Sequence, residues 1–219
     1  MISGPLPVLP LGVMKMSPLL LFAPCFSTMT SGALTGADVL EVTVLQAVPV
    51  KALETDRLIL RRRRVDEAVV YRQLWTERDP RVPPHRRISP EGRPTEEDIA
   101  ELLRAEGDAS GPGLLAVERK GTGDVIGYCG LVFHGTGAPD EPELAYELLR
   151  AAHGCGYATE AARAVVTWVS EAGYGRLWAS VWDWNVASRK VLEKLGFRET
   201  GEVEYDSVHG DSLITVREF

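Results

Sequence analysis

The hydrophobic and polar positions of the chain follow regular patterns from Leu53 onward. Apolar residues at every second position predict strands, and apolar residues at every third or fourth position predict helices. The pattern predicts strands at 56–63, 113–119, 125–133, 143–149, 176–182 and 213–219. It predicts helices at 65–79, at 95–106, from the turn at 153–156 to Gly173, and at 185–195.

Two of the predicted helices begin at residues that cap free backbone N–H groups. Thr95, with Asp98 three positions later, has the spacing of a capping box. Asn185 is expected at the N-cap of the last helix, and Gly196 is expected just after its end.

The order of these elements, β-α-α-β-β-β-α-β-α-β, predicts a single α/β domain over residues 53–219. The strands at 113–119 and 125–133 are separated by the short segment KGTGD, so they are expected to form an antiparallel hairpin. The sheet is therefore expected to be mixed and mostly antiparallel.

Residues 1–50 lack this pattern. Their only charged residues are Lys15, Asp38 and Glu41, and six prolines are scattered among apolar residues. We expect a disordered leader or an over-long gene start, with true initiation near Met29 or later. A faint likeness to a secretory signal leaves export as the alternative. No apolar run approaches the roughly 20 residues of a membrane helix, so no membrane partner is expected.

Composition narrows the function further. The formal net charge is −7, whereas a nucleic-acid binder normally carries a basic surface, so no nucleic-acid partner is expected. Cys25, Cys129 and Cys155 form no C-x-x-C pair and are odd in number, which predicts a reducing, cytoplasmic compartment. His153 and Cys155 have no second pair at ligand spacing, so no metal is expected.

The motif HGCGYATEA, which begins at His153, lies between a predicted strand and a predicted helix. Such a turn binds anions, because unpaired backbone N–H groups and the helix dipole point at the ligand.

An alternative interpretation of the turn is a dinucleotide site. The segment GCGYAT matches part of the G-x-G-x-x-G fingerprint, with Asp183 as the acid that would bind a ribose. Thr159 stands where the third glycine belongs, and only about 35 residues follow Asp183, too few for a doubly wound sheet with a substrate domain.

Two separated segments, ELAYELLRAAHGCGYATEA and WNVASRKVLEKLGF, resemble the GNAT superfamily of acetyl-CoA-dependent N-acyltransferases in sequence and order. Within it, LETDRLILRRR and YATEA are similar to the RimJ/RimL ribosomal-protein N-acetyltransferase group. The resemblance covers residues 53–219. It implies a GNAT-like domain whose central strands splay apart between flanking helices, with acetyl-CoA as co-substrate.

The resemblance also implies where acetyl-CoA binds. The turn and the helix start hold the pyrophosphate, strand backbone N–H groups face the thioester, and the last helix lies beside the pantetheine arm. The implied contact residues are Tyr146, Leu148, Leu149, His153, Gly154, Cys155, Gly156, Tyr157, Ala158, Thr159, Asn185 and Ser188. Ala151 stands at the first position of the family's Q/R-x-x-G-x-G/A motif, so one side-chain contact to the phosphates is missing.

The catalytic groups follow from the same resemblance. Many relatives place a proton-donating tyrosine seven residues after the motif asparagine, where this chain has Leu192. Either Ser188 protonates the leaving thiolate, or no protein acid does. Glu143 is the candidate general base, acting through a water, with Glu141 and Glu147 as rivals. Alternation places Glu143 and Glu147 on one face of their strand.

The expected acceptor is a primary amine, and the RimJ/RimL likeness favours the N-terminal amine of a protein. A small amine, such as an antibiotic or a polyamine, is one alternative, and a non-catalytic acyl-CoA-binding module is another. The segment 80–94, with His85, Arg86 and Arg87, is expected to edge the acceptor site and to favour an acidic or carboxylate-bearing partner. The protein is expected to act as a monomer or homodimer.

Overall fold

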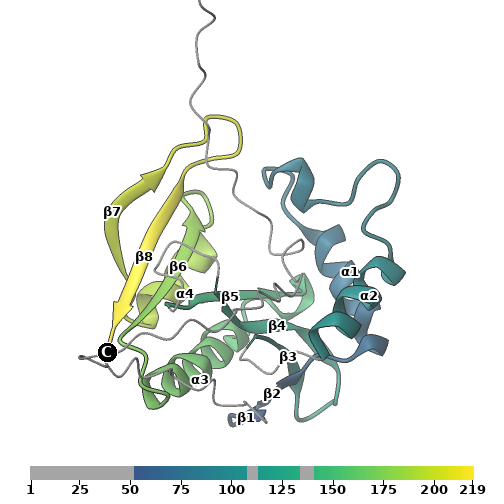
Figure 1. Cartoon of the computed structure of the whole chain (residues 1–219), viewed down its shortest axis with the longest axis horizontal. Helices are drawn as coiled ribbons and strands as arrows, with labels where there is room; N and C mark the ends of the chain where they lie inside the picture. The colour runs from purple at the N-terminus through teal and green to yellow at the C-terminus, as the bar shows by residue number, and fades with distance from the viewer. Residues whose placement is uncertain (1–51, 108–112, 134–140) are drawn as a thin grey trace, which may run out of the picture.

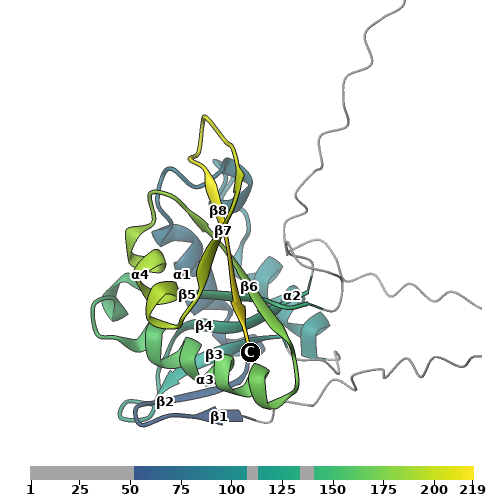
Figure 2. The same cartoon turned by 90° about the vertical axis from the view of Figure 1, so that its left-hand side faces the viewer.

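The computed structural model describes residues 52–107, 113–133 and 141–219. The expected leader at residues 1–50 lies outside the described residues. Figures 1 and 2 show a single twisted sheet with helices on both of its faces.

The strands are β1 Ala52–Glu54, β2 Leu58–Arg62, β3 Leu114–Arg119, β4 Val125–Val132, β5 Glu143–Leu148, β6 Arg176–Trp182, β7 Arg198–Glu204 and β8 Ser212–Glu218. The α-helices are α1 Ala68–Glu77, α2 Glu96–Gly107, α3 Tyr157–Glu171 and α4 Val186–Lys194. Short 3-10 helices are η1 Val65–Glu67, η2 Pro84–Arg86 and η3 Arg150–Ala152.

The eight strands lie in the order β1-β2-β3-β4-β5-β6-β8-β7. Every neighbouring pair is antiparallel except β5 and β6, which run parallel. The mixed, mostly antiparallel sheet predicted from the sequence is therefore confirmed. A doubly wound dinucleotide fold, which needs a mostly parallel sheet, does not fit this topology.

The helices cover the two faces of the sheet because each has one apolar stripe. On one face, α3 and α4 pack in the main core, and α3 contributes Ala161, Ala162, Val165, Val166 and Val169. On the other face, α1 and α2 form a second cluster from Ala68, Tyr71, Leu74, Ile99, Ala100 and Leu103. Figure 1 shows this pair set apart from β6, β7 and β8.

Two strands are absent from the prediction. β1 has three residues and sits at one edge of the sheet. β7, sequence RETGEVE, sits at the other edge, and its side chains are nearly all exposed. A strand with little buried surface needs no alternation of apolar and polar residues, so the pattern carries no signal for it.

The predicted caps are present. The Thr95 N–H donates to Asp98 Oδ2 at 2.7 Å, and the Asp98 N–H donates to Thr95 Oγ1 at 3.1 Å. Asn185 caps α4 by accepting from the Ser188 N–H at 3.1 Å. Gly173 and Gly196, with φ of 84° and 80°, follow α3 and α4 in the left-handed conformation that favours glycine.

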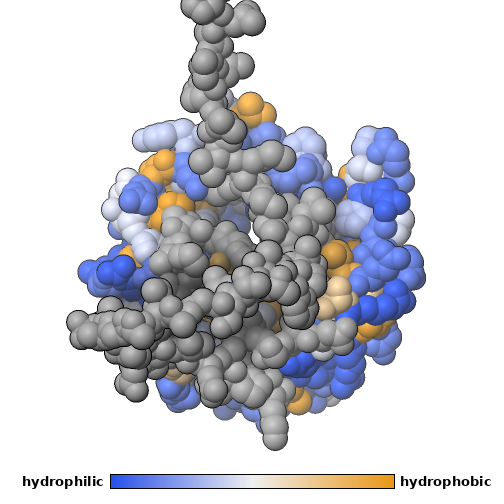
Figure 3. Space-filling view, viewed as in Figure 1, coloured by the Kyte–Doolittle hydropathy of each residue, from blue (hydrophilic) through white to orange (hydrophobic). Residues whose placement is uncertain are grey.

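Figure 3 shows a largely hydrophilic surface over α1 and α2. No helix in the described part of the chain is both long and apolar enough to cross a membrane. Within the same residues, no cluster of three or more His, Cys, Asp or Glu side chains could hold a metal ion.

Gly127 determines how closely β4 approaches β5. It pairs with Leu148, and a Cβ atom built on it would lie 2.1 Å from the Glu147 carbonyl oxygen. Its φ of 148° also disfavours a side chain. We predict that Gly127→Ala lowers the free energy of unfolding by about 2 kcal/mol or more, because the added methyl forces the two strands apart. Urea denaturation measures this change.

Gly121→Ala is the matched control, because a Cβ atom there has no neighbour within 4 Å. The control is expected to unfold within about 0.5 kcal/mol of the natural protein. Equal stability of the two variants would contradict the proposed contact between β4 and β5.

Candidate functional site

The central parallel strands, β5 and β6, separate almost as soon as they meet. Six residue pairs join β5 to β4, whereas a single pair in the described residues, Glu143 with Trp178, joins β5 to β6. Beside this pair, the Trp178 N–H donates to the Pro142 carbonyl oxygen at 2.9 Å. Beyond Glu143 the ladder ends, which leaves one edge of β5 without a strand beside it.

Backbone N–H groups of β5 point into this gap at alternate residues. The Leu149 N–H donates to the Ile126 carbonyl oxygen on β4 at 2.8 Å, so it points away from the gap. Successive N–H groups along a strand alternate in direction. The N–H groups of Leu148 and Tyr146 therefore point toward β6 and into the gap. Of the three strand residues expected to contact acetyl-CoA, Tyr146 and Leu148 thus offer backbone donors there.

The turn expected to bind phosphate lies directly after β5. His153, Gly154, Cys155 and Gly156 are exposed, and the two glycines have φ of 73° and 83°. Helix α3 starts at the next residue, Tyr157, and no side chain caps it.

The Glu160 N–H is the first to bond within α3, to the Gly156 carbonyl oxygen at 3.1 Å. The N–H groups of Tyr157, Ala158 and Thr159 precede it, in the first turn of a helix, where they have no partner within the helix. The Nε2 atom of His153 lies 2.8 Å from the Leu148 carbonyl oxygen, which ties the turn to the end of β5. The arrangement has the chemistry of an anion site.

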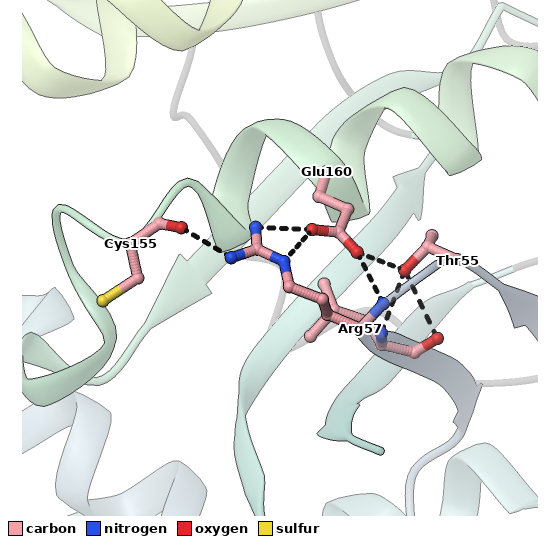
Figure 4. Close-up of polar contacts among 5 residues, drawn as sticks. Thr55, Arg57, Cys155 and Glu160 are labelled. Atoms are coloured by element: carbon pink, nitrogen blue, oxygen red, sulfur yellow. Dashed lines mark hydrogen bonds and ion pairs between the residues drawn. The ribbon is translucent and has the colours of Figure 1, made fainter. Parts of the chain in front are cut away.

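A network of polar contacts from the β1–β2 hairpin and α3 supports this turn (Figure 4). The Arg57 guanidinium donates from Nε to Glu160 Oε2 at 2.7 Å and from Nη1 to the Cys155 carbonyl oxygen at 3.1 Å. Glu160 Oε1 accepts from the Arg57 N–H at 3.0 Å and from the Thr55 hydroxyl at 2.6 Å. One arginine therefore links the N-terminal hairpin, the turn and the first turn of α3.

Burial by itself raises the pKa of Glu160. The hydrogen bonds from Thr55 and Arg57 lower it by more than burial raises it, so the pKa lies below its ordinary value of 4.5. Glu160 is accordingly ionised at neutral pH. Its ion pair with Arg57 is partly exposed, with 48% of the arginine side chain accessible to solvent. Such a pair contributes modestly to overall stability and acts mainly on local geometry.

Ser188 and Asn185 lie across the gap from β5. The Tyr146 hydroxyl is 2.7 Å from Ser188 Oγ and donates to the Ser188 carbonyl oxygen at 3.2 Å. Burial raises the pKa of Tyr146, so its phenol stays protonated at neutral pH. The expected residues Tyr146, Asn185 and Ser188 are therefore brought together on the side of the sheet that α3 covers.

Leu192 stands where many relatives have a tyrosine, and its side chain is 3% exposed within the main core. The Tyr146 hydroxyl, which comes from β5, instead reaches α4 at Ser188.

Glu143 lies on the opposite face of β5, toward α1 and α2. Its Oε1 atom accepts from the Ser180 N–H at 3.0 Å and from the Ser180 hydroxyl at 2.8 Å. These two bonds reach across the gap to β6. No lysine or arginine in the described part of the chain forms an ion pair with Glu143.

The two rival glutamates already have cationic or indole partners. Glu147 forms a bidentate pair with Arg78, with distances of 2.8 and 2.7 Å, and accepts from the Tyr128 hydroxyl at 3.0 Å. Glu141 accepts from the Trp178 indole at 2.6 Å. Glu143 is thus the glutamate at the gap with neutral hydrogen-bond donors only.

Sequence reasoning missed the supporting roles of Thr55, Arg57 and Glu160. Two of the segments used for the family resemblance, LETDRLILRRR and YATEA, contain all three residues. The signal was therefore present, but no spacing along the chain indicates that residues about 100 positions apart are hydrogen-bonded.

Comparisons with known proteins agree with this geometry. Residues 57–198 match the family described as "Acetyltransferase (GNAT) domain". An uncharacterized N-acetyltransferase p20 of Bacillus licheniformis is 29% identical over 168 residues, covering 73% of this chain and 90% of its own. The uncharacterized protein YkkB of Bacillus subtilis is 34% identical over 146 residues, covering 66% and 83%.

Solved structures show the same fold. A GNAT-family acetyltransferase from Bacillus anthracis superposes with a TM-score of 0.62 at 21% identity, covering 76% of this chain and 98% of its own. A microcin self immunity acetyltransferase in complex with acetyl-CoA and AMP has a TM-score of 0.59 at 15% identity, covering 75% and 94%. The chain belongs to the GNAT acetyltransferase family.

We predict that the contacts among Thr55, Arg57 and Glu160 strengthen acetyl-CoA binding. Glu160→Gln removes the charge that holds Arg57, so the turn at 153–156 loses its support. We expect the Kd for acetyl-CoA to rise by about threefold to tenfold, because charge-assisted bonds are lost at a partly exposed site. Isothermal titration calorimetry at pH 7 measures it. The effect should disappear as pH falls through the pKa of Glu160, below 4.5, since the natural carboxylate is then also neutral.

Glu97→Gln is the matched control, because Glu97 forms a 2.7 Å ion pair with Arg104 on the exposed surface of α2. It should leave the affinity for acetyl-CoA unchanged. Arg57→Lys keeps the positive charge but loses the forked contacts, so it should behave like Glu160→Gln. Natural affinity in both network variants would show that the turn does not need this support.

Proposed function

We propose that this protein transfers the acetyl group of acetyl-CoA to the N-terminal amine of a protein, as the RimJ/RimL group does. The observation that carries the proposal is the gap between β5 and β6. The proposed anion-binding turn and Ser188 lie on one side of it. On the other side lies Glu143, a carboxylate that is hydrogen-bonded to Ser180 and has no ion-pair partner among the described residues. An acyl donor and an amine could approach each other through this gap.

The turn fits a pyrophosphate. Its glycines are exposed, no Cβ atom obstructs the backbone, and no side chain caps the N–H groups at the start of α3. Tyr157, Ala158 and Thr159 would supply these donors. When bound, acetyl-CoA supplies an acetyl thioester, which is the activated acyl group.

The side chains at the gap can carry out the proton transfers of the reaction. Glu143 accepts a proton from the ammonium group through a water, which leaves a neutral amine to attack the thioester carbonyl. The N–H groups of Tyr146 and Leu148 stabilise the negative charge that develops on the carbonyl oxygen. Ser188 Oγ gives its proton to the departing thiolate, and the nearby Tyr146 hydroxyl can replace that proton.

The acceptor class is supported by the RimJ/RimL-like segments. Structures of similar fold include a ribosomal-protein alanine acetyltransferase from Vibrio fischeri, with a TM-score of 0.55, and a chimeric spermidine N-acetyltransferase, with a TM-score of 0.58. At 20% and 15% identity, these support the fold alone. The small-amine alternative is therefore tested directly against peptides.

The test of the proposed function is thiol release from acetyl-CoA with two acceptor panels, short peptides with free N-termini and small amines including spermidine. Peptide-dependent release, with the N-terminally acetylated peptide identified by mass spectrometry, supports the proposal. Faster turnover of small amines would favour the alternative. Binding of acetyl-CoA without turnover of either panel would identify a non-catalytic module.

Glu143→Gln tests the general base. The amide oxygen can still accept from the Ser180 N–H and hydroxyl, so the link to β6 is kept, but a neutral amide cannot take up a proton. We expect kcat to fall by about 10²-fold or more and the acidic limb of the pH–rate profile to move or disappear. Glu141→Gln is the control. A fall confined to that variant would assign the base to Glu141 instead.

Ser188→Ala and Tyr146→Phe test the proton donor. If Ser188 protonates the thiolate, its removal should lower kcat by about 10²-fold or more while the affinity for acetyl-CoA stays nearly unchanged. Tyr146→Phe should cause a smaller fall, since Ser188 can still donate. Tyr174→Phe, in the turn after α3, is the control for loss of a tyrosine hydroxyl. Natural kcat in Ser188→Ala would exclude Ser188 as the acid.

A further inference from the structure

An arginine and tryptophan layer joins the α1–α2 connection to the end of β6. The rings of Trp182 and Trp184 are stacked, with centroids 5.2 Å apart and an interplanar angle of 8°. The guanidinium of Arg86 lies 5.1 Å from the Trp182 ring, and that of Arg81 lies 4.1 Å from the Trp184 ring.

The two arginines of this layer differ in their partners. Arg81 forms a bidentate pair with Asp79 at 2.9 Å, and 55% of its side chain is exposed. Arg86 is half-buried, and its guanidinium makes no hydrogen bond or ion pair within the described part of the chain. Arg86 therefore has donors that remain available for a ligand.

Arg86 lies on the same face of the sheet as the proposed general base. Trp182, beneath it, is two residues after Ser180 on β6, and side chains two apart on a strand share a face. Ser180 is the residue that Glu143 contacts. The Arg86 carbonyl oxygen accepts from Arg78 Nη1 at 2.7 Å, and Arg78 is paired with Glu147 on β5. The loop is thus anchored over the acceptor side of the gap.

The other two residues expected to edge the acceptor site, His85 and Arg87, lie elsewhere. His85 and Arg87 line a separate cavity of about 600 Å³ between α2 and the loop, together with Trp75 and Arg93. Of the three residues expected to edge the acceptor site, Arg86 alone contacts the β6 side of the gap through Trp182.

The nearby carboxylates do not form an ion pair with Arg86. Glu147 is already paired with Arg78, and Glu143 is held by the neutral Ser180 and attracts Arg86 only through space. Burial lowers the pKa of Arg86, which shows that its charge is poorly hydrated, although a guanidinium stays protonated. A carboxylate that binds such a group makes charge-assisted, bidentate hydrogen bonds.

We infer that Arg86 binds a carboxylate of the acceptor, so that the enzyme prefers amines with a carboxylate a few bonds away. This inference rests on the proposed function. In a protein acceptor, the carboxylate belongs to an N-terminal aspartate or glutamate. In a free amino acid, it is the α-carboxylate. Both place the amine toward Glu143 while the carboxylate lies against Arg86 and the flat Trp182 ring.

The experiment compares acceptors that differ only in this charge. Thiol release is measured with peptides beginning Asp or Asn, and with free amino acids against their amides. The natural protein is expected to prefer the Asp peptide by about tenfold to hundredfold in kcat/KM. Preference for free amino acids over all peptides would assign the carboxylate to the α-carboxylate instead.

Arg86→Gln should abolish the preference while the affinity for acetyl-CoA stays unchanged. Arg81→Gln is the matched control, because Arg81 also covers an indole ring but is already paired, and it should keep the preference. Equal turnover of charged and amide acceptors by the natural protein, or an unchanged preference in Arg86→Gln, would overturn the inference.

Direct binding separates this inference from the proposed function. N-acetyl-aspartate and N-acetyl-asparaginamide, which has no carboxylate, are titrated into the protein by calorimetry, which requires no turnover. Tighter binding of N-acetyl-aspartate to the natural protein, lost in Arg86→Gln, would support carboxylate recognition even if no acceptor is acetylated. Equal binding of the two ligands, or no binding of either, would overturn it whatever the acetylation assay shows.

Discussion

The end of the β5–β6 ladder after Glu143 is the constraint on which the rest of the site depends. A continuous sheet would use the backbone donors of β5 in strand pairing and would fill the space that a thioester and an amine need. Because the ladder stops after one pair, Tyr146 and Leu148 keep donors directed at the gap. Helix α4 and the α1–α2 loop can then place side chains on its two sides.

The divergence of the two strands is bridged by side chains. The carboxylate of Glu143 reaches Ser180 on one face, and the hydroxyl of Tyr146 reaches Ser188 on the other. Beyond the single backbone pair of Glu143 and Trp178, these side-chain contacts fix the position of β5 relative to β6 and α4. The groups proposed for proton transfer therefore also take part in holding the gap, which couples its width to their hydrogen bonding.

Support for the turn comes from a distant part of the chain. Thr55 and Arg57 belong to the N-terminal hairpin, whereas Glu160 lies in α3, and their contacts meet behind the exposed glycines. A glycine-rich turn gains close approach to phosphate but loses conformational restraint. Arg57, which donates to the Cys155 carbonyl oxygen, restores that restraint from outside the turn.

The sequence by itself determined the helices, most strands, the antiparallel hairpin and the glycine-rich turn before α3, because each depends on local periodicity or glycine placement. It did not indicate β1 or β7, whose edge positions bury little surface. Tertiary structure alone decided that Tyr146 reaches Ser188, that Arg57 reaches Glu160, and that Glu147 rather than Glu143 is neutralised by an arginine. These outcomes depend on contacts between residues far apart in the chain, and no local pattern encodes such distances.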